Sequence, residues 1–197
     1  MPALTPAIRP ATQNDAPALA DFVHYASEGL ALRVWRKLAG PSGDAWAVGR
    51  ERARRETGSF SYRNAFVLEA DGAVAAGLIG YPLPDEPLTI AADLPASFVP
   101  LQELENLAAG SWYVNVLASY PAHRGKGLGT ALLDFASQTA LKLGRPSLSI
   151  IVSDGNGGAR RLYERCGYRE AARRAMRKED WINLGTHWVL LTRDARQ

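Results

Sequence analysis

A stretch rich in glycine and positive charge, residues 124–130, stands directly before the pattern of an amphipathic helix. Glycines let a backbone turn tightly, and the first N–H groups of a helix have no partner within the helix. Such donors, together with the helix dipole, favour a bound anion. The residues therefore predict a phosphate or pyrophosphate site. Its members are Arg124, Gly125, Lys126, Gly127, Leu128, Gly129 and Thr130.

The spacing of these glycines distinguishes between kinds of phosphate loop. A Walker loop needs a Lys-Ser/Thr pair after its last glycine, and Leu128-Gly129-Thr130 stands there instead. The dinucleotide fingerprint needs the spacing G-x-G-x-x-G, whereas Gly125, Gly127 and Gly129 are spaced G-x-G-x-G. Both of these nucleotide-binding classes are therefore disfavoured.

The loop resembles the acetyl-CoA loop of the GNAT (Gcn5-related N-acetyltransferase) superfamily. That signature is Arg/Gln-x-x-Gly-x-Gly/Ala with a proline three residues before the arginine, and Pro121, Arg124, Gly127 and Gly129 match it. A second segment, residues 156–168, resembles the superfamily's pattern N-x-x-A-x-x-L-Y-x-x-x-G-F/Y. Two such matches in the right order imply an acetyltransferase that uses acetyl-CoA as co-substrate and needs no metal.

The resemblance also implies roles for residues outside the loop. Backbone groups of Leu117, Ala118 and Ser119 would contact the acetyl carbonyl and the pantetheine amides. Asn156 could both cap a helix and hydrogen-bond the pantetheine arm, with capping alone as the alternative. Tyr163 stands where many members use a tyrosine as general acid, and a phenol can protonate a CoA thiolate held in contact with it. Tyr163 also belongs to an apolar stripe at helical spacing, so its side chain could instead serve only for packing.

The general base is left open by the sequence. Many relatives place a glutamate on the central strand, where this chain has Tyr113 and Asn115, neither of which is a base at neutral pH. Asp21, His24 and Glu28 share one face of the first predicted helix. His24, Glu28 or a water could therefore take the amine proton, although a solvated helix face explains these residues equally well.

Several aromatic residues could line an acceptor pocket, but packing in the core is expected for at least three of them. They are Tyr25, Trp35, Trp46, Phe60 and Tyr62. Cys166 is expected to be a small core residue rather than a nucleophile.

The hydrophobic patterns predict the elements that position these residues. The first half of the chain is expected to form a strand at 8–10, three helices, and a hairpin of strands at 65–70 and 73–81 that turns at Asp71-Gly72. The helices are expected at about 16–27, 30–38 and 45–56. Asn14 or Asp15 would cap the first and Asp44 the third, which would carry an i,i+4 pair of Glu51 and Arg55.

The second half alternates helices and strands. The helices are predicted at 101–108, 128–143 and 156–166, and the strands at 112–118, 147–152, 168–174 and 187–192. This order matches what the resemblance implies, an α/β fold with a GNAT-like mixed, V-splayed β-sheet flanked by helices. We expect one domain over residues 1–197.

The composition and charge of the chain indicate its class of protein, its kind of ligand and its location. A chain of 197 residues with 47% hydrophobic and 22% charged residues suits one globular domain. A net charge of +3, with arginines spread along the chain, suits a pocket for a polyphosphate ligand better than nucleic acid. One cysteine favours a reducing compartment, and neither a signal peptide nor an apolar run of roughly 18 residues is visible. We therefore expect a cytoplasmic protein without a membrane partner.

The predicted function is transfer of an acetyl group from acetyl-CoA to an amine, by direct attack in a ternary complex. Three alternatives stay open: an acyl-CoA-binding sensor without turnover, a different acyl group, and a hydroxyl acceptor. The sequence does not distinguish a small-molecule amine from a peptide amine. It also leaves the oligomeric state open, with a homodimer as one option.

Overall fold

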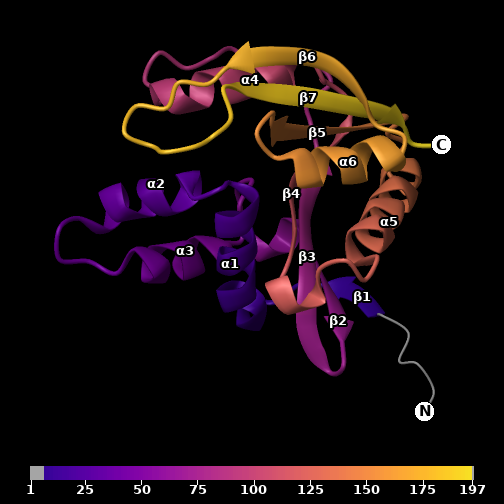
Figure 1. Ribbon diagram of the computed structural model, residues 1–197, viewed down its shortest axis with the longest axis horizontal. Helices are drawn as coiled ribbons and strands as arrows, with labels where there is room; N and C mark the ends of the chain where they lie inside the picture. Colours follow the sequence, from indigo (N-terminus) through magenta and orange to yellow (C-terminus); the bar gives the residue numbers. More distant parts are fainter. Residues whose placement is uncertain (1–6, 197) are drawn as a thin grey trace. The chain divides into compact units, whose positions relative to one another are not determined.

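The computed structural model describes residues 7–196 (Figure 1). Its contacts divide this part of the chain into two compact units. The first comprises residues 7–80 and 116–132, and the second comprises residues 81–115 and 133–196. The prediction of a single domain stays a prediction.

The first unit contains antiparallel strands in the order β1-β2-β3. These strands are β1 (Ala7–Pro10), β2 (Ala65–Ala70) and β3 (Ala73–Pro82). Between β2 and β3, Asp71 and Gly72 have φ angles of 54° and 77°. Positive φ at both central residues is what the favoured two-residue hairpin turn requires. The hairpin predicted at this pair is therefore confirmed.

Three helices complete the first unit: α1 (Ala16–Ala26), α2 (Leu30–Ala39) and α3 (Ala45–Ala53). α2 and α3 pack side by side, as Figure 1 shows, and α1 contacts both. The Asp44 carboxylate accepts a hydrogen bond from the Trp46 N–H at 2.8 Å. This bond satisfies one of the N–H groups at the start of α3, so the predicted cap is confirmed.

Aromatic packing closes the space between α2 and α3. Trp35 is 2% exposed, and its ring centroid lies 5.8 Å from that of Trp46 and 6.1 Å from that of Phe60. A Cβ at Gly49 would come within 2.6 Å of the Trp35 ring, so only glycine lets α3 approach this closely. Tyr25, Phe60 and Tyr62 pack against the core of the unit while Trp46 is half-buried, which agrees with the expectation that most of these aromatics are structural.

Two predicted features of these helices are wrong. α3 ends at Ala53, so Arg55 lies beyond it and an i,i+4 pair with Glu51 has no helix on which to form. α1 ends at Ala26, and Glu28 beyond it has a φ of 51°. Glu28 therefore does not continue the helical face that was expected to include it.

Asp15 precedes α1, but its carboxylate does not cap that helix. It accepts two hydrogen bonds of 2.9 Å from the Arg9 guanidinium and one of 2.7 Å from the Thr12 N–H. The Arg9 Nε–H donates to Glu69 at 2.7 Å. The bonds from Arg9 hold the pKa of Asp15 below its usual range, although burial opposes them. Asp15 therefore ties the start of α1 to β1 and β2.

We expect Asp15→Asn to lower the free energy of unfolding by about 1–3 kcal/mol at neutral pH. Arg9 is 36% exposed, and solvent screening favours the lower end of this range. Because the folded-state pKa of Asp15 is depressed, its stabilisation is complete above about pH 4 and is lost as the pH falls through the folded value. Urea denaturation should therefore show the difference between parent and variant shrinking in acid. An exposed-carboxylate variant, Glu51→Gln, should show neither effect, and a pH-independent difference for Asp15→Asn would contradict this account.

The second unit contains strands in the order β4-β5-β7-β6. β4 and β5 run parallel, whereas β5 with β7 and β7 with β6 run antiparallel, so the sheet is mixed. The strands are β4 (Trp112–Ser119, which continues into the first unit), β5 (Ser147–Ser153), β6 (Arg169–Ala175) and β7 (His187–Asp194). In the parallel pair, residues 112–114 lie opposite residues 148–150.

The helices of the second half are α4 (Val99–Asn106), α5 (Leu128–Lys142) and α6 (Gly157–Arg165). α4 packs against β5, β6 and β7. Within residues 7–196, the seven strands and six α-helices stand where they were predicted, with most bounds within two residues. The predicted α/β class with a mixed sheet flanked by helices is therefore confirmed, while the V-shaped opening of that sheet stays a prediction.

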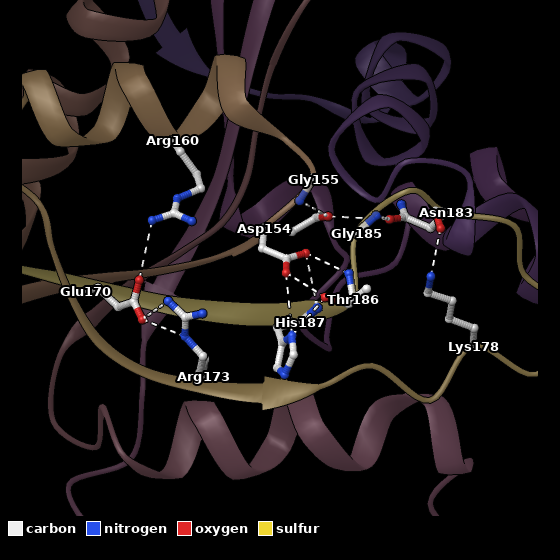
Figure 2. Close-up of polar contacts among 11 residues, drawn as sticks. Asp154, Gly155, Arg160, Glu170, Arg173, Lys178, Asn183, Gly185, Thr186 and His187 are labelled. Atoms are coloured by element: carbon white, nitrogen blue, oxygen red, sulfur yellow. Dashed lines mark hydrogen bonds and ion pairs between the residues drawn. The ribbon is translucent and has the colours of Figure 1, made fainter.

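Two neighbouring arginines show that α4 and α6 cover opposite faces of β6 and β7. Arg174 donates to Glu103 of α4 at 2.8 Å. Arg173 donates to Glu170 at 2.8 Å, and Glu170 also pairs with Arg160 of α6 at 3.4 Å. Successive residues of a strand point to opposite faces. Figure 2 accordingly shows α6, with Arg160, on one side of β6 and β7 and α4 on the other.

Candidate functional site

The glycine-rich loop turns between the end of β4 and the start of α5. Gly125 and Gly127 have φ angles of 74° and 78°, a region in which other residues are strained. A Cβ at either position would have nothing within 4 Å, so open space lies beside both backbones. Arg124 and Lys126 are exposed. A ligand can therefore approach the backbone of this loop closely, next to two positive charges.

The start of α5 adds hydrogen-bond donors to the loop. The Ala131 N–H donates to the Gly127 carbonyl at 3.1 Å, which is the first bond of the helix. The N–H groups of Leu128, Gly129 and Thr130 come before it and have no acceptor within the helix. α5 is 15 residues long, so its dipole adds positive potential at this end. The site predicted from the sequence thus has the donors and charge that a pyrophosphate needs.

Helix α1 positions the arginine of this loop. The Arg124 Cζ lies 5.9 Å from the ring centroid of Tyr25, a cation–π contact. The Tyr25 ring packs edge-on against Tyr120 at 6.3 Å, and the Tyr120 hydroxyl donates to Asp21 at 2.8 Å. Tyr25, predicted only as an aromatic of a pocket or the core, therefore supports the phosphate loop. Charge and spacing alone gave no sign of this contact.

The three residues before the loop form the end of β4. Leu117, Ala118 and Ser119 are half-buried, and Ala118 packs against the core of the first unit. The Tyr120 N–H donates to the Ala75 carbonyl at 3.0 Å, which joins the end of β4 to β3. The segment is thus held firmly beside the loop, and its backbone contact with a pantetheine arm stays a prediction.

Asn156 stands at the start of α6 and caps it. Its side-chain oxygen accepts a hydrogen bond from the Ala159 N–H at 3.1 Å. The capping role predicted from the sequence is therefore confirmed, and a bond to the pantetheine arm stays a prediction.

Tyr163 lies on α6 and is 5% exposed. Its ring centroid lies 6.0 Å from that of Tyr168, at an interplanar angle of 58°. Tyr168 is itself fully buried, with the Arg193 Cζ 5.2 Å from its ring centroid. The ring of Tyr163 thus packs as the apolar stripe predicted, which is compatible with the packing role and with the acid role.

Tyr113 of β4 is a buried phenol that contacts a second tyrosine. Tyr113 is 4% exposed and its ring packs edge-on against that of Tyr81 at 5.8 Å. Burial above all, and then the neighbouring Glu105, Tyr81 and Tyr163, raise the pKa of Tyr113 well above its usual value. Tyr113 is therefore neutral at physiological pH, as expected for a residue that cannot serve as a base.

Glu105 of α4 is a functional candidate that the sequence did not single out. It is half-buried, and burial raises its pKa to about 7. A short helix was predicted here, but nothing in its sequence showed which neighbours would surround this carboxylate. α4 packs on β5, β6 and β7, and burial in this packing accounts for the raised pKa.

Comparison with protein-family models matches residues 31–168 to the acetyltransferase (GNAT) family. The chain belongs to the GNAT acetyltransferase family. A comparison with curated proteins gave no match. The two motifs that resembled this superfamily, at the start of α5 and along α6, both lie within the matched residues.

Solved GNAT structures share this fold over nearly the whole chain. The crystal structure of an acetyltransferase is 23% identical with a TM-score of 0.65, covering 96% of this chain and 99% of that chain. An N-acetyltransferase from Staphylococcus aureus Mu50 is 18% identical with a TM-score of 0.63, covering 95% and 100%. A GNAT family acetyltransferase from Elizabethkingia anophelis, with acetyl-CoA bound, is 16% identical with a TM-score of 0.59, covering 96% and 97%. At these identities the likeness establishes the fold, and the GNAT-like α/β fold is confirmed.

Two residues in the first unit of this GNAT protein, His24 and Glu28, were predicted as candidate general bases. His24 is half-buried, with its ring centroid 5.2 Å from that of Trp46, and burial lowers its pKa. Its Nδ1 has no hydrogen-bond partner among residues 7–196. His24 is thus a neutral imidazole packed against aromatic rings, while Glu28 has left the helix that was to align it with His24.

A polar network holds the turn between β5 and α6 of the GNAT fold (Figure 2). The Asp154 carboxylate accepts hydrogen bonds from the Thr186 and His187 N–H groups at 2.7 and 3.1 Å, and from the Thr186 hydroxyl at 2.9 Å. Burial raises the pKa of Asp154, but these bonds outweigh it and bring the pKa to about 2. Asp154 therefore stays ionised and fixes the start of β7 beside the turn that leads to Asn156.

Two further features of residues 7–196 bear on partners. No three His, Cys, Asp or Glu side chains in this range are arranged to hold a metal ion. Each helix in the same range is too short or too polar to traverse a lipid bilayer.

Proposed function

We propose that this GNAT protein transfers an acetyl group from acetyl-CoA to an amine by direct attack in a ternary complex. The observation that carries the proposal is the loop at the start of α5. Two glycines at positive φ with open space beside them, helix N–H groups and the charges of Arg124 and Lys126 form a cradle for a pyrophosphate. CoA carries such a pyrophosphate, and a GNAT acetyltransferase from Elizabethkingia anophelis has acetyl-CoA bound.

Each remaining site residue takes one role in this proposal. The backbone of Leu117, Ala118 and Ser119 binds the acetyl carbonyl and the pantetheine amides. Asn156 holds the pantetheine arm with the part of its side chain that does not cap α6. The Tyr163 phenol gives its proton to the departing CoA thiolate, which is the acid step that a buried tyrosine near the reacting sulfur can supply.

Direct attack is favoured over transfer through a covalent acyl-enzyme. Cys166 is the sole cysteine of the chain. It is half-buried at the end of α6, more exposed than the core position expected from the sequence. Its N–H donates to the Leu162 carbonyl at 3.0 Å, as in an ordinary helix end.

The proposed acceptor is a small-molecule or peptide amine, and neither nucleic acid nor a membrane is proposed as a partner. The net charge of +3 serves the phosphates of CoA in this account. No metal takes part. We also keep the cytoplasmic location and a homodimer as proposals.

The main alternative is an acyl-CoA sensor without turnover. A neutral Tyr113 in place of a strand carboxylate favours the sensor. Tyr163, retained at the acid position, favours the enzyme. Transfer of a different acyl group, or transfer to a hydroxyl acceptor, would use the same residues of this chain. These alternatives differ from the proposal only in the acyl donor or in the acceptor.

Release of free thiol from acetyl-CoA across a panel of amines and peptides tests the proposal. We expect release above the hydrolytic background with at least one amine, and a stable amide in the products. Longer acyl-CoA donors and hydroxyl compounds in the same panel distinguish the other transferase alternatives. Tight acetyl-CoA binding by calorimetry without thiol release for any acceptor would support the sensor instead.

A further inference from the structure

The guanidinium of Arg124 in the phosphate loop is held by an aromatic ring rather than by a carboxylate. Its Cζ lies 5.9 Å from the ring centroid of Tyr25, and it forms no ion pair with another residue in the described range 7–196. Arg9, Arg50 and Arg63 of the same unit instead pair with carboxylates, at 2.9, 3.0 and 2.7 Å. A carboxylate would compete with a phosphate for the guanidinium, whereas a ring face leaves its charge and its N–H donors available. Arg124 is thus positioned without being neutralised.

The ring of Tyr25 is itself fixed by a second tyrosine. Tyr120 packs edge-on against Tyr25, with 6.3 Å between the ring centroids and an interplanar angle of 81°, and its centroid lies 5.0 Å from that of Phe22. The Tyr120 hydroxyl donates to Asp21 at 2.8 Å, and the Tyr120 N–H donates to the Ala75 carbonyl at 3.0 Å. Helix α1 and strand β3 therefore both hold Tyr120 in place, and through it the ring on which the arginine rests.

Contact with this ring changes what Arg124 loses when a ligand binds. Arg124 is exposed, and an exposed arginine side chain samples many rotamers that must be ordered when it binds a phosphate. A ring that already holds the guanidinium removes part of that entropic cost before the ligand arrives. It also keeps the cation beside the start of α5, where the N–H groups of Leu128 and Gly129 have no acceptor within the helix.

We propose that Tyr25 is a positioning residue for the pyrophosphate of acetyl-CoA, because it holds the Arg124 guanidinium beside the glycine loop before the ligand binds. The inference rests on the proposed function only through acetyl-CoA binding, so it applies equally to an acyl-CoA sensor. Tyr25 acts through Arg124 and not on the reacting atoms. Its contribution therefore belongs to the affinity for acetyl-CoA and to the KM for that substrate, and kcat does not depend on it.

The test is a double-mutant cycle of Tyr25→Leu and Arg124→Ala, measured by calorimetric titration with acetyl-CoA. Leucine keeps an apolar side chain at the position and removes the ring face. Tyr25→Leu should weaken acetyl-CoA binding by about 2–5-fold, the effect of one exposed cation–π contact. In the Arg124→Ala background the same substitution should have no further effect. Tyr25→Phe retains the ring and should bind acetyl-CoA as the parent does.

Tyr62→Leu is the matched control for the loss of a ring. The Arg63 Cζ lies 5.1 Å from the ring centroid of Tyr62, in the same unit but outside the phosphate loop. Tyr62→Leu should therefore leave the affinity for acetyl-CoA unchanged. Steady-state kinetics with any accepted amine should show that Tyr25→Leu raises the KM for acetyl-CoA at constant kcat. Titration with dephospho-CoA, which keeps the pyrophosphate and lacks the 3′-phosphate, should show the same loss for Tyr25→Leu as titration with CoA.

A folded Tyr25→Leu that binds acetyl-CoA as tightly as the parent would overturn the assignment while leaving the acetyltransferase intact. An equal loss in the Arg124→Ala background would also overturn it, since Tyr25 would then act only through the packing of α1. A loss seen with CoA but not with dephospho-CoA would overturn the contact with the pyrophosphate. If Tyr25→Leu does not fold, Tyr25→Met takes its place in the same cycle. A parent that does not bind acetyl-CoA would overturn the proposed function, and the role of Tyr25 with it.

Discussion

Replacing Tyr163 by phenylalanine should lower turnover by about 10²–10⁴-fold, the usual contribution of a general acid. The variant retains the ring that packs at 6.0 Å from Tyr168 and lacks the hydroxyl group that carries the proton. Stability and acetyl-CoA affinity should therefore barely change. Single-turnover kinetics with any accepted amine, together with calorimetry for acetyl-CoA, measure the two effects separately.

Tyr168 offers a matched control for this experiment. Its hydroxyl is buried and has no hydrogen-bond partner within residues 7–196, so Tyr168→Phe removes a phenol from the same cluster without breaking a bond. We expect that variant to turn over at the parent rate. Thermal melting of both variants must accompany the kinetics, because an unfolded variant says nothing about catalysis. A folded Tyr163→Phe that binds acetyl-CoA and keeps the full rate would show that Tyr163 only packs.

Replacing Gly127 by valine should abolish acetyl-CoA binding. The φ of 78° at Gly127 strains any side chain, and the open space beside its backbone is where the pyrophosphate must approach. A branched side chain fills that space. A bulky residue at Gly129, whose N–H belongs to the unpaired start of α5, should weaken binding because its side chain would crowd these donors. Calorimetric titration with acetyl-CoA measures the loss.

Gly58→Val is the control for backbone strain in the glycine experiment. Gly58 has a φ of 89°, is exposed, and has nothing within 4 Å of a built Cβ, but it lies outside the loop. Gly58→Val and Gly127→Val should lower the free energy of unfolding by similar amounts. Only Gly127→Val should abolish acetyl-CoA binding. Unchanged affinity in folded variants at both Gly127 and Gly129 would refute the phosphate-loop assignment.

Features that depend on residues within one or two turns of each other could be predicted from the local sequence. Asp71-Gly72 closed the predicted hairpin because both residues tolerate positive φ. Asp44 and Asn156 capped the helices that follow them, since a cap needs only the first N–H groups of its own helix. The loop before α5 has the predicted turn and donors for the same local reason.

Contacts between residues that are distant in the chain became visible only in the folded structure. Asp15 was predicted as a possible helix cap. Its carboxylate instead binds Arg9, which also binds Glu69 on the paired strand. The packing of α1 brings Tyr25 into cation–π contact with Arg124. Burial in the packing of α4 on the sheet raises the pKa of Glu105 to about 7. Burial and pairing depend on neighbours remote in the chain, so a local pattern can place these residues on their elements but cannot show their surroundings.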